Sequence, residues 1–284
     1  MSNRIQSFHH TVSRMSSHFA GRFTNPLINR LTNHLSNLSV LGTAIGLSLA
    51  TSLVVHAPAA QSQTLPIMAN SCTSRGNGTY ICTFDNSGKR PGPQAYRSYD
   101  GQVTRVGKGW IPNGYGVLVF ESDNRYEGQM RNGLPHGTGM FLFANNDRYQ
   151  GQVREGIPEV RGTFTLANGD YYKGQIMDGH PHGLGQYYFA NSDGTYNGQF
   201  FLGQIKGTGT YDTPSAVCEG QFFSSKLSGQ GTCNYRGNSS MRTYTGEWRG
   251  GIPDGRGTMQ YSDGRRFFGE FRAGKEFIPN KVAK

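Results

Sequence analysis

Apolar and polar residues alternate along most of the chain, and short turns interrupt the alternation at regular intervals. In the stretch "YEGQMRNGLPHGTGMFLF", which begins at Tyr126, apolar residues or glycines take every second position on both sides of "RNGLPHG". A period of two predicts strands, and a turn rich in Gly and Asn between two such strands predicts a β-hairpin. This stretch is therefore expected to form one hairpin.

The same stretch returns along the chain. With its first residue as offset zero, the copies start at Tyr126, Tyr149, Tyr172, Tyr196, Cys218, Tyr244 and Phe267, at spacings of 23, 23, 24, 22, 26 and 23 residues. Glycine recurs at offsets two and thirteen, and these repeat glycines are Gly128, Gly139, Gly151, Gly162, Gly174, Gly185, Gly198, Gly209, Gly220, Gly231, Gly246 and Gly257. So regular a period defines the architecture. We expect an all-β fold, an elongated single-layer antiparallel sheet of consecutive hairpins that follows an N-terminal signal or anchor helix.

The repeat glycines are expected to have a packing role. If the two strands of a hairpin pair so that offsets sum to seventeen, the glycine at offset two faces the large residue at offset fifteen, and the glycine at offset thirteen faces offset four. A ring laid across a glycine covers bare backbone and offsets the weakness of glycine in a strand. The glycines would thus make room for rings.

The copies resemble MORN repeats, whose usual pattern is YxGxxxxGxxxGxGxxxx. The resemblance covers residues 126 to about 274, and a degenerate first copy with inserted residues begins at Tyr99. Cys218 departs from the pattern by replacing the aromatic residue, Ser225 by replacing the turn glycine, and Val160 by replacing another glycine. The resemblance implies a non-enzymatic interaction module of the kind found in scaffolds, membrane-associated assemblies and dimers, with a proposed affinity for acidic phospholipids.

The N-terminal segment has the composition of a targeting signal rather than of a folded domain. No acidic residue precedes Asp85, and residues 38–55 contain no charge. A basic leader, an apolar run and small residues at Ala57, Ala59 and Ala60 predict a secretory signal, and the run is also long enough for an uncleaved membrane anchor. An organelle transit peptide is the alternative. We expect the protein to be exported to a periplasm, cell envelope or extracellular space, or to be anchored by residues 38–55.

These features divide the chain into four segments. The expected segments are a signal peptide or anchor at 1–60, a linker with a small cysteine hairpin at 61–98, a repeat domain at 99–274 and a basic tail at 275–284. Cys72 and Cys82 bracket a glycine-rich turn, which predicts a disulfide between them. A disulfide between Cys218 and Cys233 is not expected, because offsets zero and fifteen would be diagonal neighbours about 7 to 8 Å apart in the pairing above.

Motifs for catalysis are missing from the sequence. Neither a phosphate-binding loop nor a GxSxG or HExxH arrangement occurs, so we expect no catalytic residue, no cofactor and no enzyme activity. Asp178, His180 and His182 stand close together, but the repeat places His182 at a turn offset, and we expect no metal there. The rival enzyme hypothesis is a hydrolase that uses scattered carboxylates such as Asp170 and Asp193.

The distribution of charge indicates which classes of partner the protein can bind. The formal net charge is +10. At offset five, an exposed position, the chain carries Arg131, Arg154, Arg249 and Arg272, which would line up across neighbouring hairpins. Such a column can meet acidic phospholipid, acidic polysaccharide or an acidic protein. Nucleic acid is not expected as a partner, because the chain carries the signals of an exported protein.

The remaining copies carry Met177, Phe201 and Phe223 at offset five. Three adjacent hairpins would then present one apolar patch with arginines at both ends, and exposed patches of this kind often mark interfaces. We therefore predict that Met177, Phe201 and Phe223 contact a protein partner or a second copy in a homodimer. The alternative is that both phenylalanines fold over and shield their own hairpins.

Overall fold

The computed structural model describes residues 68–84 and 95–279. The expected signal or anchor lies outside these residues, as does the end of the basic tail. The described strands are β1 Ser71–Ser74, β2 Tyr80–Thr83, β3 Tyr96–Val106, β4 Gly109–Phe120, β5 Arg125–Arg131, β6 Leu134–Leu142, β7 Arg148–Arg154, β8 Ile157–Thr165, β9 Tyr171–Met177, β10 His180–Phe189, β11 Gly194–Phe201, β12 Gln204–Thr213, β13 Ala216–Phe223, β14 Lys226–Tyr235, β15 Met241–Arg249, β16 Ile252–Tyr261, β17 Arg266–Arg272 and β18 Lys275–Phe277. Among the described residues, none forms a helix long and apolar enough to cross a membrane.

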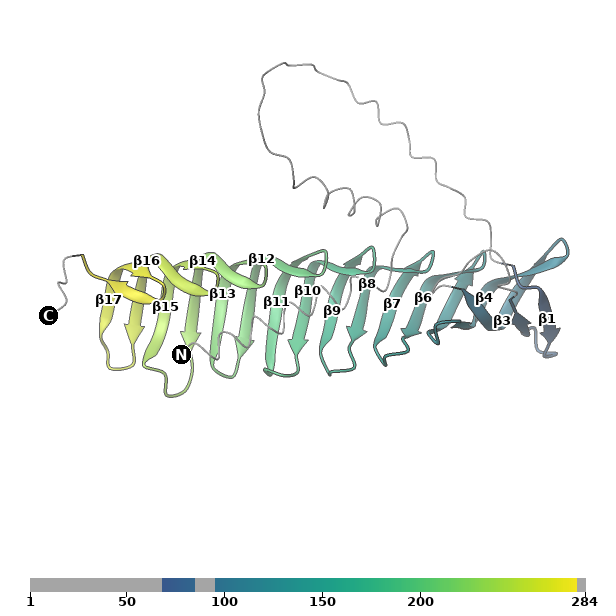
Figure 1. The fold of residues 1–284 in the computed structure, drawn as a ribbon, viewed down its shortest axis with the longest axis horizontal. Coiled ribbons are helices and arrows are strands. Elements are labelled where there is room, and N and C mark those ends of the chain that lie inside the picture. Colours follow the sequence, from purple (N-terminus) through teal and green to yellow (C-terminus); the bar gives the residue numbers. More distant parts are fainter. Residues whose placement is uncertain (1–67, 85–94, 280–284) are drawn as a thin grey trace, which may run out of the picture.

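The described strands form one open antiparallel sheet. Each strand pairs with the next along the chain, from β1 to β18. In Figure 1 the strands stand side by side across the long axis of the molecule. The prediction of consecutive hairpins in one elongated sheet is confirmed.

The repeat glycines form a single row across the sheet. Gly128 stands opposite Gly139 within its hairpin, and Gly139 stands opposite Gly151 in the next hairpin. The same pairing continues without a break from Gly101 in β3 to Gly269 in β17. Because glycine faces glycine here, the pairing expected from the sequence, in which each glycine faces a large side chain, is wrong.

The ring that covers each glycine pair is the tyrosine at offset zero of the same hairpin. A Cβ added at Gly139 or Gly162 would collide with the ring of Tyr126 or Tyr149 respectively. These tyrosines are fully buried. The packing role predicted for the glycines is therefore confirmed, but the covering ring comes from offset zero rather than from offsets four and fifteen.

A bulge beyond the glycine pair within each hairpin divides the register into two parts, and neither part matches the expected one. Offsets zero and fifteen pair directly, as Tyr126 and Phe141 do, whereas beyond the glycines Met130 pairs with Pro135. The side chain of Gln129 occupies the bulge, where its Oε1 accepts a 3.1 Å hydrogen bond from the Thr138 N–H. Equivalent bonds run from the N–H groups of Tyr115, Leu184 and Thr208 to Gln102, Gln175 and Gln199. The glutamines thus satisfy backbone donors that the bulge leaves unpaired.

Apolar packing links each repeat mainly to its neighbours. The ring at offset zero packs edge-on against the offset-four residue of the next repeat, with 5.0 Å between the centroids of Tyr172 and Phe200 and 5.1 Å between those of Tyr196 and Phe222. Side chains at offset four, such as Met130, are buried together with these rings. Since the core is a chain of nearest-neighbour contacts, stability is expected to be nearly one-dimensional.

The hairpin β13–β14 departs from the repeat because it lacks the tyrosine. Cys218 and Cys233 stand directly opposite each other with 4.0 Å between their Cα atoms, and they form a disulfide. The expectation that no disulfide links these two cysteines is wrong, since the true register makes offsets zero and fifteen direct partners. Leu227 covers the glycine pair in place of a ring, and the Trp248 indole donates a 3.0 Å hydrogen bond to the Gly231 carbonyl.

A second disulfide closes the N-terminal hairpin β1–β2. Cys72 and Cys82 are direct cross-strand partners in a disulfide, which confirms that prediction. The turn between them contains Gly76 and Gly78, both at positive φ. This hairpin extends the sheet beyond β3 and is held to β4 by the Trp110 ring, whose centroid lies 5.0 Å from that of Tyr80.

Candidate interaction surface

The tips of the repeat hairpins are two-residue turns in which both residues have positive φ. Asn132 and Gly133 form one such turn, with φ angles of 50° and 80°. This geometry is typical of the turns that connect tightly paired antiparallel strands, and it favours Asn, Asp and Gly. The residue at offset five therefore ends the first strand of each hairpin beside the turn and on the outer face, opposite the tyrosine rings.

Met177, Phe201 and Phe223 are exposed at three successive tips, as expected from the sequence. Their side chains are 37%, 48% and 60% exposed respectively. The alternative, in which the phenylalanines fold over and shield their own hairpins, does not match these values.

Leu202 adds a fourth apolar side chain at the tip of the hairpin β11–β12. It is 44% exposed and has a φ of 46°, in the left-handed region. Residues at the same turn position in the other repeats are Asn132, Glu155, Asp178, Ser224, Gly250 and Ala273. A leucine there gains little burial and carries a conformational cost. We call Met177, Phe201, Leu202 and Phe223 the tip patch.

A lysine lies between the two rings of the tip patch. The Lys206 Nζ is 5.0 Å from the ring centroid of Phe201 and 5.6 Å from that of Phe223. These distances are within the range of cation–π attraction. On the other side of Phe201, the His182 ring lies 5.4 Å away, centroid to centroid. The patch thus combines exposed apolar surface with a positive charge held at its centre.

The four arginines predicted to flank the patch are all exposed at offset five. Arg249 forms an ion pair with Asp254 at 3.6 Å, and Arg272 forms one with Glu270 at 2.9 Å. Arg131 and Arg154 form no ion pair with a described residue. Two arginines therefore stand on each side of the tip patch, and only the N-terminal two lack a carboxylate partner in the part of the chain that the structure describes.

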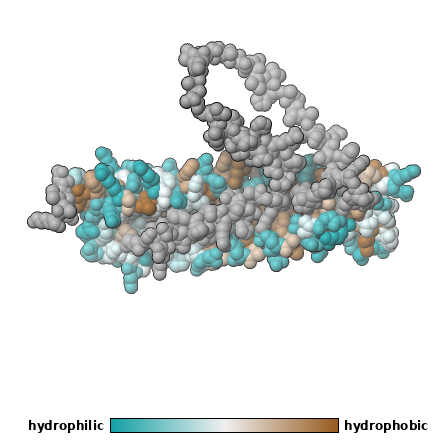
Figure 2. Space-filling view, in the orientation of Figure 1, coloured by the Kyte–Doolittle hydropathy of each residue, from teal (hydrophilic) through white to brown (hydrophobic). Residues whose placement is uncertain are grey.

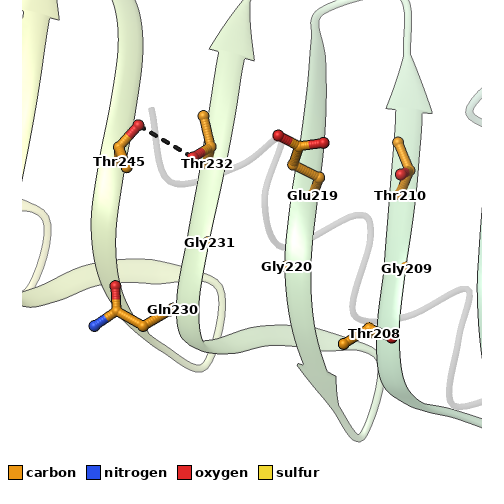
Figure 3. A pocket seen from close by; sticks show the side chains of 9 residues that line it. All are labelled: Thr208, Gly209, Thr210, Glu219, Gly220, Gln230, Gly231, Thr232 and Thr245. Carbon is orange, nitrogen blue, oxygen red and sulfur yellow. Dashed lines mark hydrogen bonds between the residues drawn. The ribbon is translucent and has the colours of Figure 1, made fainter.

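The outer face also carries a pocket lined by polar side chains. Figure 3 shows a pocket over β12–β15 whose floor is formed by Gly209, Gly220 and Gly231. Threonine side chains line it, and the hydroxyls of Thr232 and Thr245 are 3.1 Å apart. In the space-filling view, hydrophilic and apolar residues are interspersed along the coloured part of the visible face (Figure 2).

The carboxylates of the rival hydrolase hypothesis have structural partners. Asp170 is buried, where it accepts hydrogen bonds of 2.8 Å from the Ala190 N–H and 2.9 Å from the Tyr187 hydroxyl. It thereby joins the turns of two neighbouring repeats. Asp193 accepts a 3.0 Å hydrogen bond from the Tyr188 hydroxyl. Within the described residues no group of three His, Cys, Asp or Glu side chains is arranged to hold a metal ion.

Sequence reasoning missed Leu202 and Lys206. The expected surface consists of residues at offset five, whereas these two residues occupy offsets six and ten. A leucine at a turn offset that otherwise carries Asn, Asp, Glu, Ser, Gly or Ala is a signal readable from the sequence. Lys206 gives no such signal, because its position between two rings depends on the bulge that bends the tip of the hairpin.

Comparison of the sequence with known protein families matches the MORN repeat over residues 126–148, 149–171, 172–194, 196–215, 218–240 and 244–265. Residues 126–265 are six tandem MORN repeats. MORN repeats are interaction modules for proteins and membranes and are generally non-enzymatic. The hairpin β3–β4 has the same glycine pairing, Gly101 with Gly116, but lies outside the matched residues.

Two further comparisons add little to this assignment. No curated protein matches the sequence. Among solved structures, the TCP10c domain of Drosophila melanogaster Sas-4 matches at 14% identity and a TM-score of 0.32, over 57% of this chain and 97% of that chain. The TCP10 domain of Danio rerio CPAP, in complex with a peptide of Danio rerio STIL, matches at 13% identity and a TM-score of 0.34, over 67% of this chain and 72% of that chain.

Proposed function

We propose that this protein is an exported or membrane-tethered, non-enzymatic scaffold that binds a protein partner or a second copy of itself through the tip patch. The observation that carries the proposal is the exposure of Phe201 and Phe223, 48% and 60%, at successive hairpin tips of one face. Burial of two phenylalanine side chains contributes on the order of 3 to 5 kcal/mol, enough to support association where the fit is good. The MORN repeats supply a rigid row on which neighbouring tips are held in register.

The test is a Phe201→Ser, Phe223→Ser double variant, compared with wild type by circular dichroism, sedimentation and retention of proteins from the cell envelope. We expect an unchanged sheet and the loss of association. Phe268→Ser is the matched control, because Phe268 is 79% exposed and lies outside the tip patch. Loss of the sheet in the double variant of a monomeric, partner-free wild type would mean that the patch is structural.

Export is supported by the leader sequence and by two disulfides, since disulfides persist in oxidising compartments. The intact mass of the native protein tests this part of the proposal. A mass that corresponds to cleavage near Ala59 or Ala60 indicates a signal peptide, and a full-length membrane-bound species indicates an anchor. A full-length soluble cytosolic species would contradict export.

A second candidate function is the binding of acidic phospholipid headgroups or acidic polysaccharide. It is favoured by Arg131 and Arg154, which are exposed at neighbouring tips and have no ion-pair partner among the described residues. Phosphate and carboxylate groups of such polymers would bind these guanidinium groups, and salt would screen the attraction. Retention on acidic vesicles that disappears at high salt and in an Arg131→Gln, Arg154→Gln variant distinguishes this function from protein binding.

A further inference from the structure

The tip patch carries positive charge that no described residue neutralises by an ion pair. Lys206 is exposed between the rings of Phe201 and Phe223, and Lys226 is the cross-strand partner of Phe223. Neither lysine forms an ion pair with a described residue. This differs from the C-terminal side of the patch, where Arg249 is paired with Asp254.

We propose that the tip patch binds an acidic, apolar segment of another protein, in which a carboxylate pairs with Lys206 while neighbouring apolar side chains contact Phe201 and Phe223. The inference rests on the proposed protein-binding function and names the chemistry of its partner. Apolar contacts alone would accept any hydrophobic segment. An ammonium group that lies against two rings adds a point charge to the patch, and a carboxylate of the bound segment would form a charge-assisted ion pair with it.

Charge complementarity favours this occupant over a second copy of the chain. In a two-fold dimer the same patch faces itself, so Lys206 and Lys226 of one copy would approach the same lysines of the other. The whole chain is also basic, with a net charge of +10. An acidic segment removes this repulsion, whereas self-association through the patch increases it.

The spacing of the tips sets the length of the segment. Equivalent residues of successive hairpins are separated by two strand spacings, roughly 10 Å, so the three tips that carry Met177, Phe201 and Phe223 span roughly 20 Å. An extended chain rises about 3.3 Å per residue, and about six residues therefore cover the patch. Leu202, exposed at the central tip beside Phe201, lies within the same span.

The test is selection of random peptides of about twelve residues, displayed on phage, against four immobilised full-length proteins with their disulfides formed. These are the wild type, Lys206→Met, the Phe201→Ser, Phe223→Ser double variant and a control, Lys173→Met. Lys173 is an exposed lysine of β9 away from the tips. We expect the wild type and Lys173→Met to enrich peptides in which Asp or Glu adjoins Leu, Phe or Trp, and Lys206→Met to lose the acidic preference.

Enriched peptides are then measured in solution by fluorescence anisotropy. We expect roughly tenfold weaker binding for Lys206→Met, and a similar loss when the acidic residue of the peptide is changed to its amide, because one charge-assisted contact is removed. Apolar peptides without acidic enrichment on the wild type would overturn the inference, as would equal affinity of wild type and Lys206→Met. Dimerisation through the patch in sedimentation, or binding of phosphatidylglycerol vesicles that requires Phe201 and Phe223, would also overturn it.

The variants separate this inference from the proposed function. If the phenylalanine double variant loses peptide binding but Lys206→Met does not, the patch is a protein-binding site without the acidic preference. If the phenylalanine double variant binds the selected peptides as tightly as wild type, the tip patch is not the site and both proposals fail.

Discussion

The Tyr149 hydroxyl donates a 2.7 Å hydrogen bond to the Gln152 carbonyl, three residues further along the same strand. Gln152 lies at the bulge, where the register between β7 and β8 shifts. The bond recurs from Tyr99, Tyr126, Tyr172, Tyr196 and Tyr244 to the carbonyls at offset three. One side chain thus covers the glycine pair with its ring and binds a carbonyl of the bulge with its hydroxyl.

The ring over each glycine pair leaves no room for a methyl group. We expect Gly162→Ala to lower the free energy of unfolding by about 1 to 3 kcal/mol, because the added Cβ would overlap the Tyr149 ring. Gly231→Ala is the matched control. Both glycines lie at offset thirteen and neither has a positive φ, but near Gly231 the closest side-chain atoms are Leu227 methyl carbons at 3.0 and 3.1 Å.

Urea unfolding followed by circular dichroism measures both variants. Because leucine rotates more easily than a tyrosine ring held by its hydroxyl, the control is expected to lose less stability. A smaller loss for Gly162→Ala than for Gly231→Ala would mean that the ring is not what requires glycine.

The buried tyrosines predict unfolding at alkaline pH. Burial raises the pKa of both Tyr196 and Tyr244 from 10.0 to about 12, and it also raises the pKa of Tyr126 and Tyr149. The unfolded chain ionises these groups first and releases their protons, so the stability they contribute is fully present below pH 10 and is lost as pH rises from 10 through 12.

Circular dichroism and tyrosinate absorbance, recorded together across this range, check the prediction. Loss of the sheet should accompany ionisation. Tyr196→Phe removes one of these ionisable groups, so its stability should depend less steeply on pH in the same range. Ionisation of the repeat tyrosines near pH 10 in an intact sheet would contradict the prediction.

Val160 is the least favourable backbone residue of the repeats. It has a φ of 63° and is 49% exposed, at the offset where other copies have glycine. A β-branched residue in the left-handed region is strained. We expect Val160→Gly to raise the midpoint of urea unfolding, with a gain of roughly 1 kcal/mol. Val117→Gly, in a strand position without positive φ, should instead destabilise the protein. Equal effects of the two changes would show that Val160 is unstrained.

The Cys218–Cys233 disulfide stands at the offset of the tyrosine in the hairpin where Leu227 covers the glycine pair. It closes a loop with a sequence separation of 15 residues, for which the constraint on the unfolded chain is worth about 3 kcal/mol. We expect a Cys218→Ala, Cys233→Ala variant to unfold first around β13–β14. Fluorescence of Trp248 in a Trp110→Phe background reports on this region. A reducing agent should destabilise the parent protein more than the variant, in which only the Cys72–Cys82 disulfide remains to be reduced. A variant as stable as its parent would contradict the expectation.

The periodic glycines were sufficient to predict the hairpins and the single sheet, because a period of about 23 residues with a turn at its centre has few other solutions. They were not sufficient for the register. A bulge shifts pairing by two residues without altering the alternation on either side, so it is invisible in the hydrophobic pattern. In the sequence, the bulge corresponds to Gln at offset three together with Gly at offset eleven, as in Gln129 and Gly137. This combination can be recognised as a bulge signal only because the structure places the two residues in contact.

The error over the Cys218–Cys233 disulfide follows from the same wrong register, since these two residues are direct partners. The alternation of apolar and polar residues predicts only part of the candidate surface. Exposure at offset five follows from alternation, and Phe201 and Phe223 are exposed as expected. The position of Lys206 between their rings depends on how the bulge bends the hairpin tips, which alternation does not encode.

The strands lie across the long axis of the sheet, so the hydrogen bonds between them run along it (Figure 1). A pull on the two ends of the sheet would therefore open these bonds one strand pair at a time rather than shear many together. Each hairpin would lengthen the chain as it opened, while its neighbours stayed folded. The Cys72–Cys82 and Cys218–Cys233 bonds set a covalent limit on two hairpins of this series. The sheet would act under tension as an extensible tether in which these two hairpins cannot fully open.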